Sequence, residues 1–159
     1  MTRIAYLEIS PRQSGKTARL IKKAVTLSQQ GHTVVYVTSC LDEERQNALR
    51  RVGVIVHKDG EPLPEHLDED RAVWFYDEFD WLKSITVRMG GYYATTAKRL
   101  RDPAVDTADD DVLLALLKAN GYSHERHYLP LLMRDILREG RHLYSAEEYR
   151  RLCLGEFLT

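Results

Sequence analysis

The stretch that most constrains the fold of this chain is IAYLEISPRQSGKTARLIKKA, at residues 4–24. A short apolar run is followed by a loop and then by apolar residues at helical spacing, which predicts a strand, a loop and a helix. Gly15, Lys16 and Thr17 open that helix in the manner of a phosphate-binding loop. In such loops backbone N–H groups, the helix N-terminus and the lysine surround phosphate groups, while the hydroxyl reaches Mg²⁺. The stretch therefore predicts an α/β protein with a nucleotide site.

The loop departs from the usual pattern, G-x-x-x-x-G-K-[ST], at its first position, which Ser10 occupies. The second glycine of the pattern, Gly15, lets the backbone approach the phosphates closely, and it is present. The first glycine mainly serves the turn that leaves the strand, so Ser10 followed by Pro11 predicts a different turn without the loss of a ligand. We expect the loop to bind ATP through Ser10, Pro11, Arg12, Gln13, Ser14, Gly15, Lys16 and Thr17.

An acidic pair closes a second apolar run, AVWFYDE, at residues 72–78. A phosphate loop that works with Mg²⁺ needs a carboxylate at the end of a neighbouring hydrophobic strand, and an adjacent glutamate can polarise the attacking water. Asp77 and Glu78 stand in that order. We therefore predict that Thr17 and Asp77 bind Mg²⁺, and that Glu78 is the catalytic residue that activates water for ATP hydrolysis.

The remaining strand and helix patterns alternate, which predicts a mainly parallel central sheet with helices on its faces. The segment at residues 59–71 has two prolines and six carboxylates, so we expect a solvated loop there. The expected strands are 3–9, 32–39, 52–58, 72–81 and 90–97, and the expected helices between them are 16–31 and 41–53.

Beyond residue 98 the sequence becomes helical, after a polar stretch at 98–111 that is typical of a linker. Pro130 is expected near the start of one helix, and Ser145 and Glu148 have capping-box spacing at the start of another. The expected helices are 109–121, 128–140 and 145–155, and each ends at a glycine: Gly121, Gly140 and Gly155.

At 159 residues the chain is long enough for one domain and too short for a second of full size. We expect a P-loop ATPase core at residues 1–100 and a helical C-terminal subdomain at 101–159, packed on the core. No apolar run approaches the roughly 18 to 20 residues that cross a bilayer, and the N-terminus lacks the pattern of a signal peptide. These features predict a cytoplasmic protein with no membrane partner.

The charge balance gives no global sign of a nucleic-acid partner, because 23 Lys and Arg face 24 Asp and Glu. Any contact with DNA then has to be local. Basic clusters could touch DNA phosphate or a neighbour's nucleotide, although such clusters are more often solvated faces; they are Arg150 and Arg151, and Lys98, Arg99 and Arg101. The cysteines and the closely spaced histidines are too few for a metal site; they are Cys40 and Cys153, and His124 and His127.

Four segments together resemble the large terminase subunits of tailed bacteriophages, which are DNA-packaging motors. SPRQSGKT is similar to their Walker A loop, in which an arginine inside the loop and a missing first glycine are common. VWFYDE is similar to their Walker B strand with its catalytic glutamate, and YYATTAK to the Thr-rich coupling motif that follows. EEYRRLCLGEF resembles the segment that closes their ATPase region. The resemblance covers most of the chain in order.

This resemblance implies an additional-strand P-loop ATPase that couples hydrolysis of Mg²⁺-ATP to translocation of double-stranded DNA. It implies Arg12 as a stabiliser of transition-state charge, and Thr95 and Thr96 as residues that couple the γ-phosphate to movement. Its implied partners are a portal or other packaging proteins and further copies of the chain in a ring, in the cytoplasm of an infected bacterial host. The family's upstream adenine-contacting motif and C-terminal nuclease domain are not found in this sequence, so we expect any nuclease subunit to act in trans.

Two other functions stay open. SGKTARLIKKAVTLSQQGHTVVYVTS also resembles the opening of type II thymidine kinases, which use the same loop with a carboxylate base. Those enzymes carry a cysteine zinc site and a C-terminal substrate lasso, neither of which this sequence contains. The second alternative is a nucleotide-binding assembly or switch module that hydrolyses little, and Glu78 argues against it because pure binding has no need of that residue.

Overall fold

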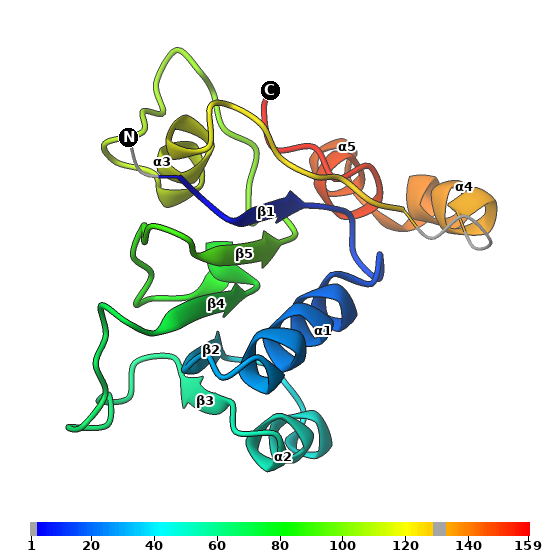
Figure 1. The fold of residues 1–159 in the computed structure, drawn as a ribbon. Coiled ribbons are helices and arrows are strands. Elements are labelled where there is room, and N and C mark those ends of the chain that lie inside the picture. Colours follow the sequence, from blue (N-terminus) through cyan, green and yellow to red (C-terminus); the bar gives the residue numbers. More distant parts are fainter. Residues whose placement is uncertain (1–2, 129–132) are drawn as a thin grey trace.

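In the part of the chain that the structure describes, the strands form a single parallel sheet (Figure 1). The structure is a computed structural model, and it describes residues 3–128 and 133–159. The strands in these residues are β1 (Tyr6–Ile9), β2 (Val34–Thr38), β3 (Ile55–Lys58), β4 (Val73–Asp77) and β5 (Tyr92–Thr95). Their order across the sheet is β1-β5-β4-β2-β3. The predicted α/β class with a parallel central sheet is confirmed.

Strand β5 lies between β1 and β4 and pairs in parallel with both. The pairing places Thr95 beside Ile9 of β1, and Ala94 beside Asp77 of β4. Parallel strands end at the same edge of a sheet, where open α/β sheets form their ligand crevices. The loop after β1 and the acidic end of β4 therefore share this edge, with one strand between them.

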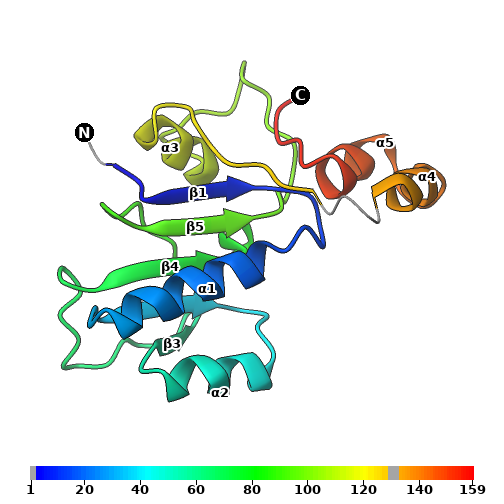
Figure 2. The ribbon, with the colours of Figure 1, turned by 45° about the vertical axis from the view of Figure 1, so that its right-hand side comes forward.

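Helices cover both faces of the sheet (Figure 2). Helices α1 (Lys16–Gln29) and α2 (Glu43–Arg51) pack on one face, and α3 (Val112–Ala119) packs on the other. Leu20 and Ala24 of α1 belong to one apolar cluster with Phe75, whereas Leu113 of α3 belongs to a second cluster with Leu7. Because the central strands are buried on both faces, their sequences are continuous apolar runs rather than alternating ones.

The ends of these helices follow the local signals in the sequence. The side chains of Asp42 and Asp111 precede α2 and α3 and accept hydrogen bonds from the backbone N–H groups of Arg45 (2.9 Å) and Leu114 (3.1 Å). Gly31, with φ of 89°, follows α1. The acidic start predicted for α3 is therefore confirmed. The predicted end of α1 at Gly31 is also confirmed, because glycine adopts the left-handed conformation that ends a helix without steric cost.

The C-terminal helices differ from the prediction at one glycine. Helix α4 (Met133–Leu143) continues past Gly140, so the expected end at that residue is wrong. Gly140 is buried, and a Cβ added to it would lie 2.6 Å from Sγ of Cys153. This glycine therefore allows α4 to pack closely on the next segment instead of ending the helix. The expected position of Pro130 lies outside the described residues.

The next segment consists of a short helix and a wider turn. Helix α5 (Ala146–Glu148) begins at the predicted capping box of Ser145 and Glu148, in which both reciprocal hydrogen bonds are present. A π-helical turn, η2 (Tyr149–Cys153), follows and was not predicted. None of the helices in the part of the chain that the structure describes is long and apolar enough to cross a membrane.

Two connecting segments have different characters. Residues 59–72 contain no helix or strand, as expected for an acidic loop. The segment at 98–111 is not a free linker, because Arg101 is only 2% exposed and its backbone N–H donates to Phe157 O over 2.7 Å. Helix α3 shares an apolar cluster with the sheet, and the proposed division of the chain at residue 100 stays a prediction.

Candidate functional site

The loop after β1 folds back on itself at the start of α1. Gln13 and Gly15 both have left-handed backbone conformations, with φ of 53° and 84°, and Lys16 is the first residue of α1. Ser14 Oγ donates to Pro11 O over 2.8 Å, and Lys16 Nζ donates to the same oxygen over 3.2 Å. The amino group of the lysine therefore lies over the loop that the sequence predicts to bind phosphate.

Ser10, at the position of the missing glycine, is fully buried and bonded to two other segments. Its hydroxyl donates to Glu8 Oε1 over 2.8 Å and accepts from the backbone N–H of His127 over 2.9 Å. The next residue is also enclosed, because a Cβ on Gly155 would lie 2.7 Å from Pro11 Cδ. A serine thus serves the turn through its side chain, where the usual pattern relies on the flexibility of glycine.

The segment that reaches Ser10 extends the edge of the sheet beside β1. Ile9 N–H donates to Glu125 O over 3.0 Å, and Glu125 N–H donates to Leu7 O over 2.8 Å. The sequence did not predict this pairing, because residues 122–128 show no apolar alternation that would indicate a strand.

Thr17 and Asp77 meet at the end of β4. Thr17 Oγ1 lies 3.1 Å and 3.2 Å from the two carboxylate oxygens of Asp77. Asp77 is 1% exposed, and burial together with the charge of Glu78 raises its pKa to about 6, against the hydrogen bond from Thr17. A buried carboxylate that resists ionisation would be stabilised by a nearby cation.

This pair fits Mg²⁺, which prefers hard oxygen ligands and usually keeps several waters and phosphate oxygens around it. Within the described ranges, 3–128 and 133–159, there is no cluster of three or more His, Cys, Asp or Glu side chains that could hold a metal. A metal at Thr17 and Asp77, the two predicted ligands, would therefore take its remaining ligands from nucleotide and water.

Glu78 lies at the meeting point of the loop and β5. Its backbone is left-handed, with φ of 51°, a strained conformation that costs a non-glycine residue about 1–3 kcal/mol. Oε1 lies 3.2 Å from Lys16 Nζ, while Oε2 accepts from Thr96 N–H over 2.9 Å and from Thr95 Oγ1 over 3.3 Å. The structure thus brings together the residues that the sequence assigned to catalysis, phosphate binding and coupling.

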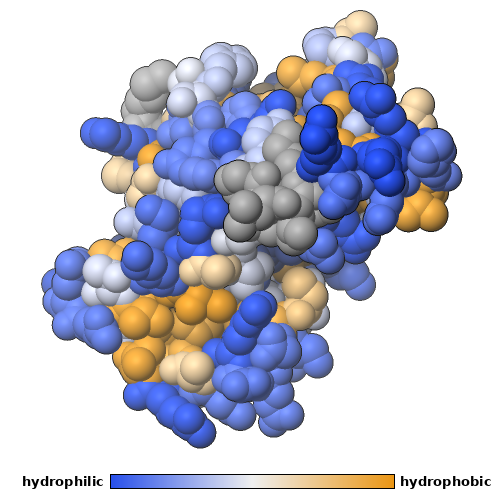
Figure 3. Space-filling view, turned by 90° about the vertical axis from the view of Figure 1, so that its right-hand side faces the viewer, coloured by the Kyte–Doolittle hydropathy of each residue, from blue (hydrophilic) through white to orange (hydrophobic). Residues whose placement is uncertain are grey.

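Two adjoining cavities open beside Glu78, and Arg12 and Leu152 line both. The first, of about 390 Å³, is also lined by Gln13, Lys16, Tyr144 and Cys153. The second, of about 330 Å³, is also lined by Ser39, Cys40, Trp81 and Thr96. Figure 3 shows this side of the molecule, where the strands end, and hydrophilic residues cover most of it.

The C-terminal wall of the first cavity was not predicted from the sequence. Leu152 O accepts the backbone N–H of Arg12 over 2.9 Å, so η2 braces the loop directly. Arg12 itself is exposed. A contact between residues 140 positions apart leaves no local signal in a single sequence.

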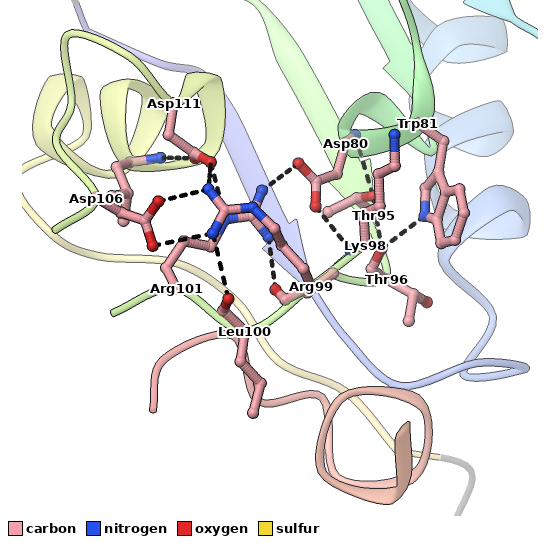
Figure 4. A network of polar contacts seen from close by, with 12 residues as sticks. Asp80, Trp81, Thr95, Thr96, Lys98, Arg99, Leu100, Arg101, Asp106 and Asp111 are labelled. Carbon is pink, nitrogen blue, oxygen red and sulfur yellow. Dashed lines mark hydrogen bonds and ion pairs between the residues drawn. The ribbon is translucent and has the colours of Figure 1, made fainter. Parts of the chain in front are cut away.

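A buried ion network lies next to Thr95 and involves Asp80, two residues after Glu78 (Figure 4). The backbone N–H of Asp80 donates to Thr95 Oγ1 over 3.3 Å, and its carboxylate accepts from Lys98 N–H over 2.6 Å. The same carboxylate pairs with Arg101, whose Nε donates to Asp111 over 3.0 Å. Arg101 therefore has a structural role and is not available to DNA or to a neighbour's nucleotide.

The other basic residues and the histidines that the sequence singled out mostly contact groups within the chain. Arg99 pairs with Asp106, Arg150 pairs with Glu156, and Arg151 donates to Ala97 O. His124 packs edge-on against Phe157, and His127 Nε2 lies 2.7 Å from a carboxylate oxygen of Glu125. Both cysteines are free: Cys40 is exposed and Cys153 is buried.

No protein family, curated protein or solved structure was found to match this chain. The assignment of a function therefore rests on the residues of the site and on their geometry.

Proposed function

We propose that this chain is a Mg²⁺-dependent P-loop ATPase of the additional-strand type. The observation that carries the proposal is the convergence of Lys16, the Thr17–Asp77 pair and Glu78 at one edge of a parallel sheet. The strand order supports the additional-strand type, because β5 separates the loop strand from the acidic strand. Neither feature alone is specific. An acidic turn without a role in nucleotide binding would not be expected to form an ion pair with a loop lysine, as Glu78 does with Lys16.

In the proposed reaction Lys16 and the loop N–H groups hold the phosphates, and Thr17 and Asp77 hold Mg²⁺. The bound Mg²⁺ would offset negative charge on the phosphate oxygens. Glu78 orients a water molecule and accepts its proton as the water oxygen bonds to the γ-phosphorus. The bond between that phosphorus and the bridging oxygen breaks, so the products are ADP and phosphate.

Glu78 is held for this role by Thr96. The Thr96 N–H binds Oε2 of Glu78, and Lys16 pairs with Oε1. When Lys16 binds the phosphates instead, Oε1 becomes free to accept a hydrogen bond from water. The link through Thr95 and Thr96 also connects Glu78 to β5, which is consistent with the proposed coupling role of these two residues.

We also propose that the ATPase acts as a terminase-like motor on double-stranded DNA. Support for this finer assignment comes from the resemblance of the four sequence segments. On this proposal the chain assembles with copies of itself in a ring, with a portal or other packaging proteins, and with a nuclease supplied in trans, in the cytoplasm of a bacterial host.

The site assignment is tested by calorimetric titration with Mg²⁺ and a non-hydrolysable ATP analogue. Wild type should bind, and Lys16→Ala should lose binding, whereas Lys22→Ala provides a matched control on an exposed position of the same helix. Equal binding by wild type and Lys16→Ala would refute the site. Phosphate release that rises with double-stranded DNA would support the motor, and formation of thymidine monophosphate from added thymidine would instead establish a kinase.

A further inference from the structure

We infer that Arg19 and Glu8 are positioning residues that set the orientation of the phosphate loop, an inference that rests on the proposed function. Neither residue belongs to the loop pattern in the sequence. Glu8 lies on β1 before the loop, and Arg19 lies on α1 after it. Their side chains pair behind the loop, with Arg19 Nε donating to Glu8 over 3.2 Å.

Arg19 also holds a backbone group of the loop itself. Its Nη2 donates to Ser14 O over 2.7 Å, and a Cβ on Gly15 would lie 3.0 Å from its Nη1. The peptide bond between Ser14 and Gly15 is planar and trans, so its carbonyl and its N–H point in opposite directions. With the Ser14 carbonyl turned toward Arg19, the Gly15 N–H is turned away from the guanidinium, and on the proposed function this N–H binds phosphate.

Glu8 holds both Arg19 and Ser10 in place through hydrogen bonds. It is fully buried and accepts hydrogen bonds from Tyr6 OH (2.6 Å), from Ser10 Oγ (2.8 Å) and from Arg19. Burial opposes ionisation of the carboxyl, but the bonds from Arg19, Tyr6 and Ser10 outweigh it and lower its pKa. A buried charge is tolerated only where such partners satisfy it.

The anchor also explains why a serine at the first loop position is compatible with phosphate binding. Ser10 and Arg19 share one carboxylate, so the turn at the start of the loop and the peptide before Gly15 are fixed by the same group. The alternative is that the Glu8–Arg19 pair only joins β1 to α1. In that case its loss lowers stability and leaves nucleotide affinity unchanged.

Calorimetric titration with Mg²⁺ and a non-hydrolysable ATP analogue, together with steady-state hydrolysis, separates the two roles. Arg19→Met should weaken binding by about tenfold to a hundredfold, the range for one hydrogen bond to a charged group. Arg19→Lys should restore part of the affinity, and Lys22→Met, on the exposed face of the same helix, should bind like wild type. KM should rise while kcat changes little, since a loop N–H binds phosphate in both ground and transition states.

The double variant Glu8→Gln with Arg19→Met keeps the inference testable if the single variant fails to fold, because it leaves no unpaired buried charge. Weak binding by this folded double variant supports the inference. Wild-type affinity in either folded Arg19→Met variant would overturn it and would leave the proposed ATPase intact. Failure of wild type itself to bind the analogue would overturn the proposed function as well.

Discussion

Lys16 Nζ lies 3.2 Å from Glu78 Oε1, so the loop lysine and the proposed catalytic glutamate form an ion pair. Each of the two groups has another task in the proposed reaction: Lys16 binds phosphate and Glu78 binds water. Nucleotide binding therefore has to exchange the contact between Lys16 and Glu78 for a contact between Lys16 and phosphate.

The first prediction follows from this competition. Glu78→Gln should bind a non-hydrolysable ATP analogue as tightly as wild type or up to about fivefold more tightly, because a partly exposed ion pair contributes about 0–1 kcal/mol. Calorimetric titration measures the change. Glu61→Gln, in an exposed loop, is the matched control and should have no effect. Binding weakened tenfold by Glu78→Gln would show that the pair does not compete with nucleotide.

Arg12 is exposed, lines both cavities beside Glu78, and is tethered to η2 through its backbone, a position compatible with the proposed role. If it stabilises charge in the transition state, Arg12→Ala should lower kcat by a factor on the order of 10² or more with little change in ATP affinity. Turnover is to be measured with and without double-stranded DNA. A variant as fast as wild type under both conditions would remove Arg12 from the mechanism.

The pKa of Asp77 predicts a distinctive pH dependence of stability without nucleotide or Mg²⁺. Its folded-state pKa of about 6 lies above the ordinary value of 3.8, so the Asp77 carboxyl ionises at a lower pH in the unfolded chain than in the folded one. Stability contributed by the protonated group is present below pH 4 and is lost as pH rises to 6, by an amount on the order of 3 kcal/mol.

Asp77→Asn should remove this contribution. Denaturant unfolding of both proteins from pH 4 to pH 7 gives the difference in the free energy of unfolding at each pH, and taking the difference cancels the contributions of the other carboxyl groups. The variant should gain stability relative to wild type as pH rises. A difference that does not change with pH would show that Asp77 ionises normally in the folded protein.

The buried network predicts that substitutions of two neighbouring arginines lower the free energy of unfolding by unequal amounts. The side chain of Arg101 is 3% exposed and satisfies Asp80 and Asp111, so Arg101→Met should lower the free energy of unfolding by about 3–5 kcal/mol by leaving buried charge without a partner. Arg99→Met, at a residue 46% exposed, should cost about 0–1 kcal/mol. Denaturant unfolding compares them, and equal losses would contradict the assigned role of Arg101.

The presence of the strands, the loop and the acidic pair could be predicted because their signals are local, but the expected strand at 72–81 was too long: β4 ends at Asp77, and Phe79–Trp81 form a 3-10 helical turn. Each of these signals lies within a few positions of the sequence: an apolar run of four to eight residues, a glycine before Lys16, and a carboxylate at a strand end. The order of the strands is not local, and the placement of β5 between β1 and β4 is seen only in the structure.

The residues that sequence reasoning missed depend on distant partners. Glu8 sits inside an apolar strand, where a single acidic residue gives no sign that Arg19 will neutralise it. Tyr6, Glu8 and Ser10 alternate and so share one face of β1, which is the one signal that could have indicated a buried polar group. Gly140 was misread because a glycine gives the same signal whether it ends a helix or permits close packing.

Release of phosphate from Mg²⁺-ATP by wild type and by Glu78→Gln, each with and without double-stranded DNA, tests the central claim most directly. The proposal predicts that wild type hydrolyses ATP and that the variant, folded and still able to bind nucleotide, is slower by a factor on the order of 10² to 10⁴, the usual contribution of a positioned general base. Equal rates of hydrolysis for the two proteins under both conditions would contradict it.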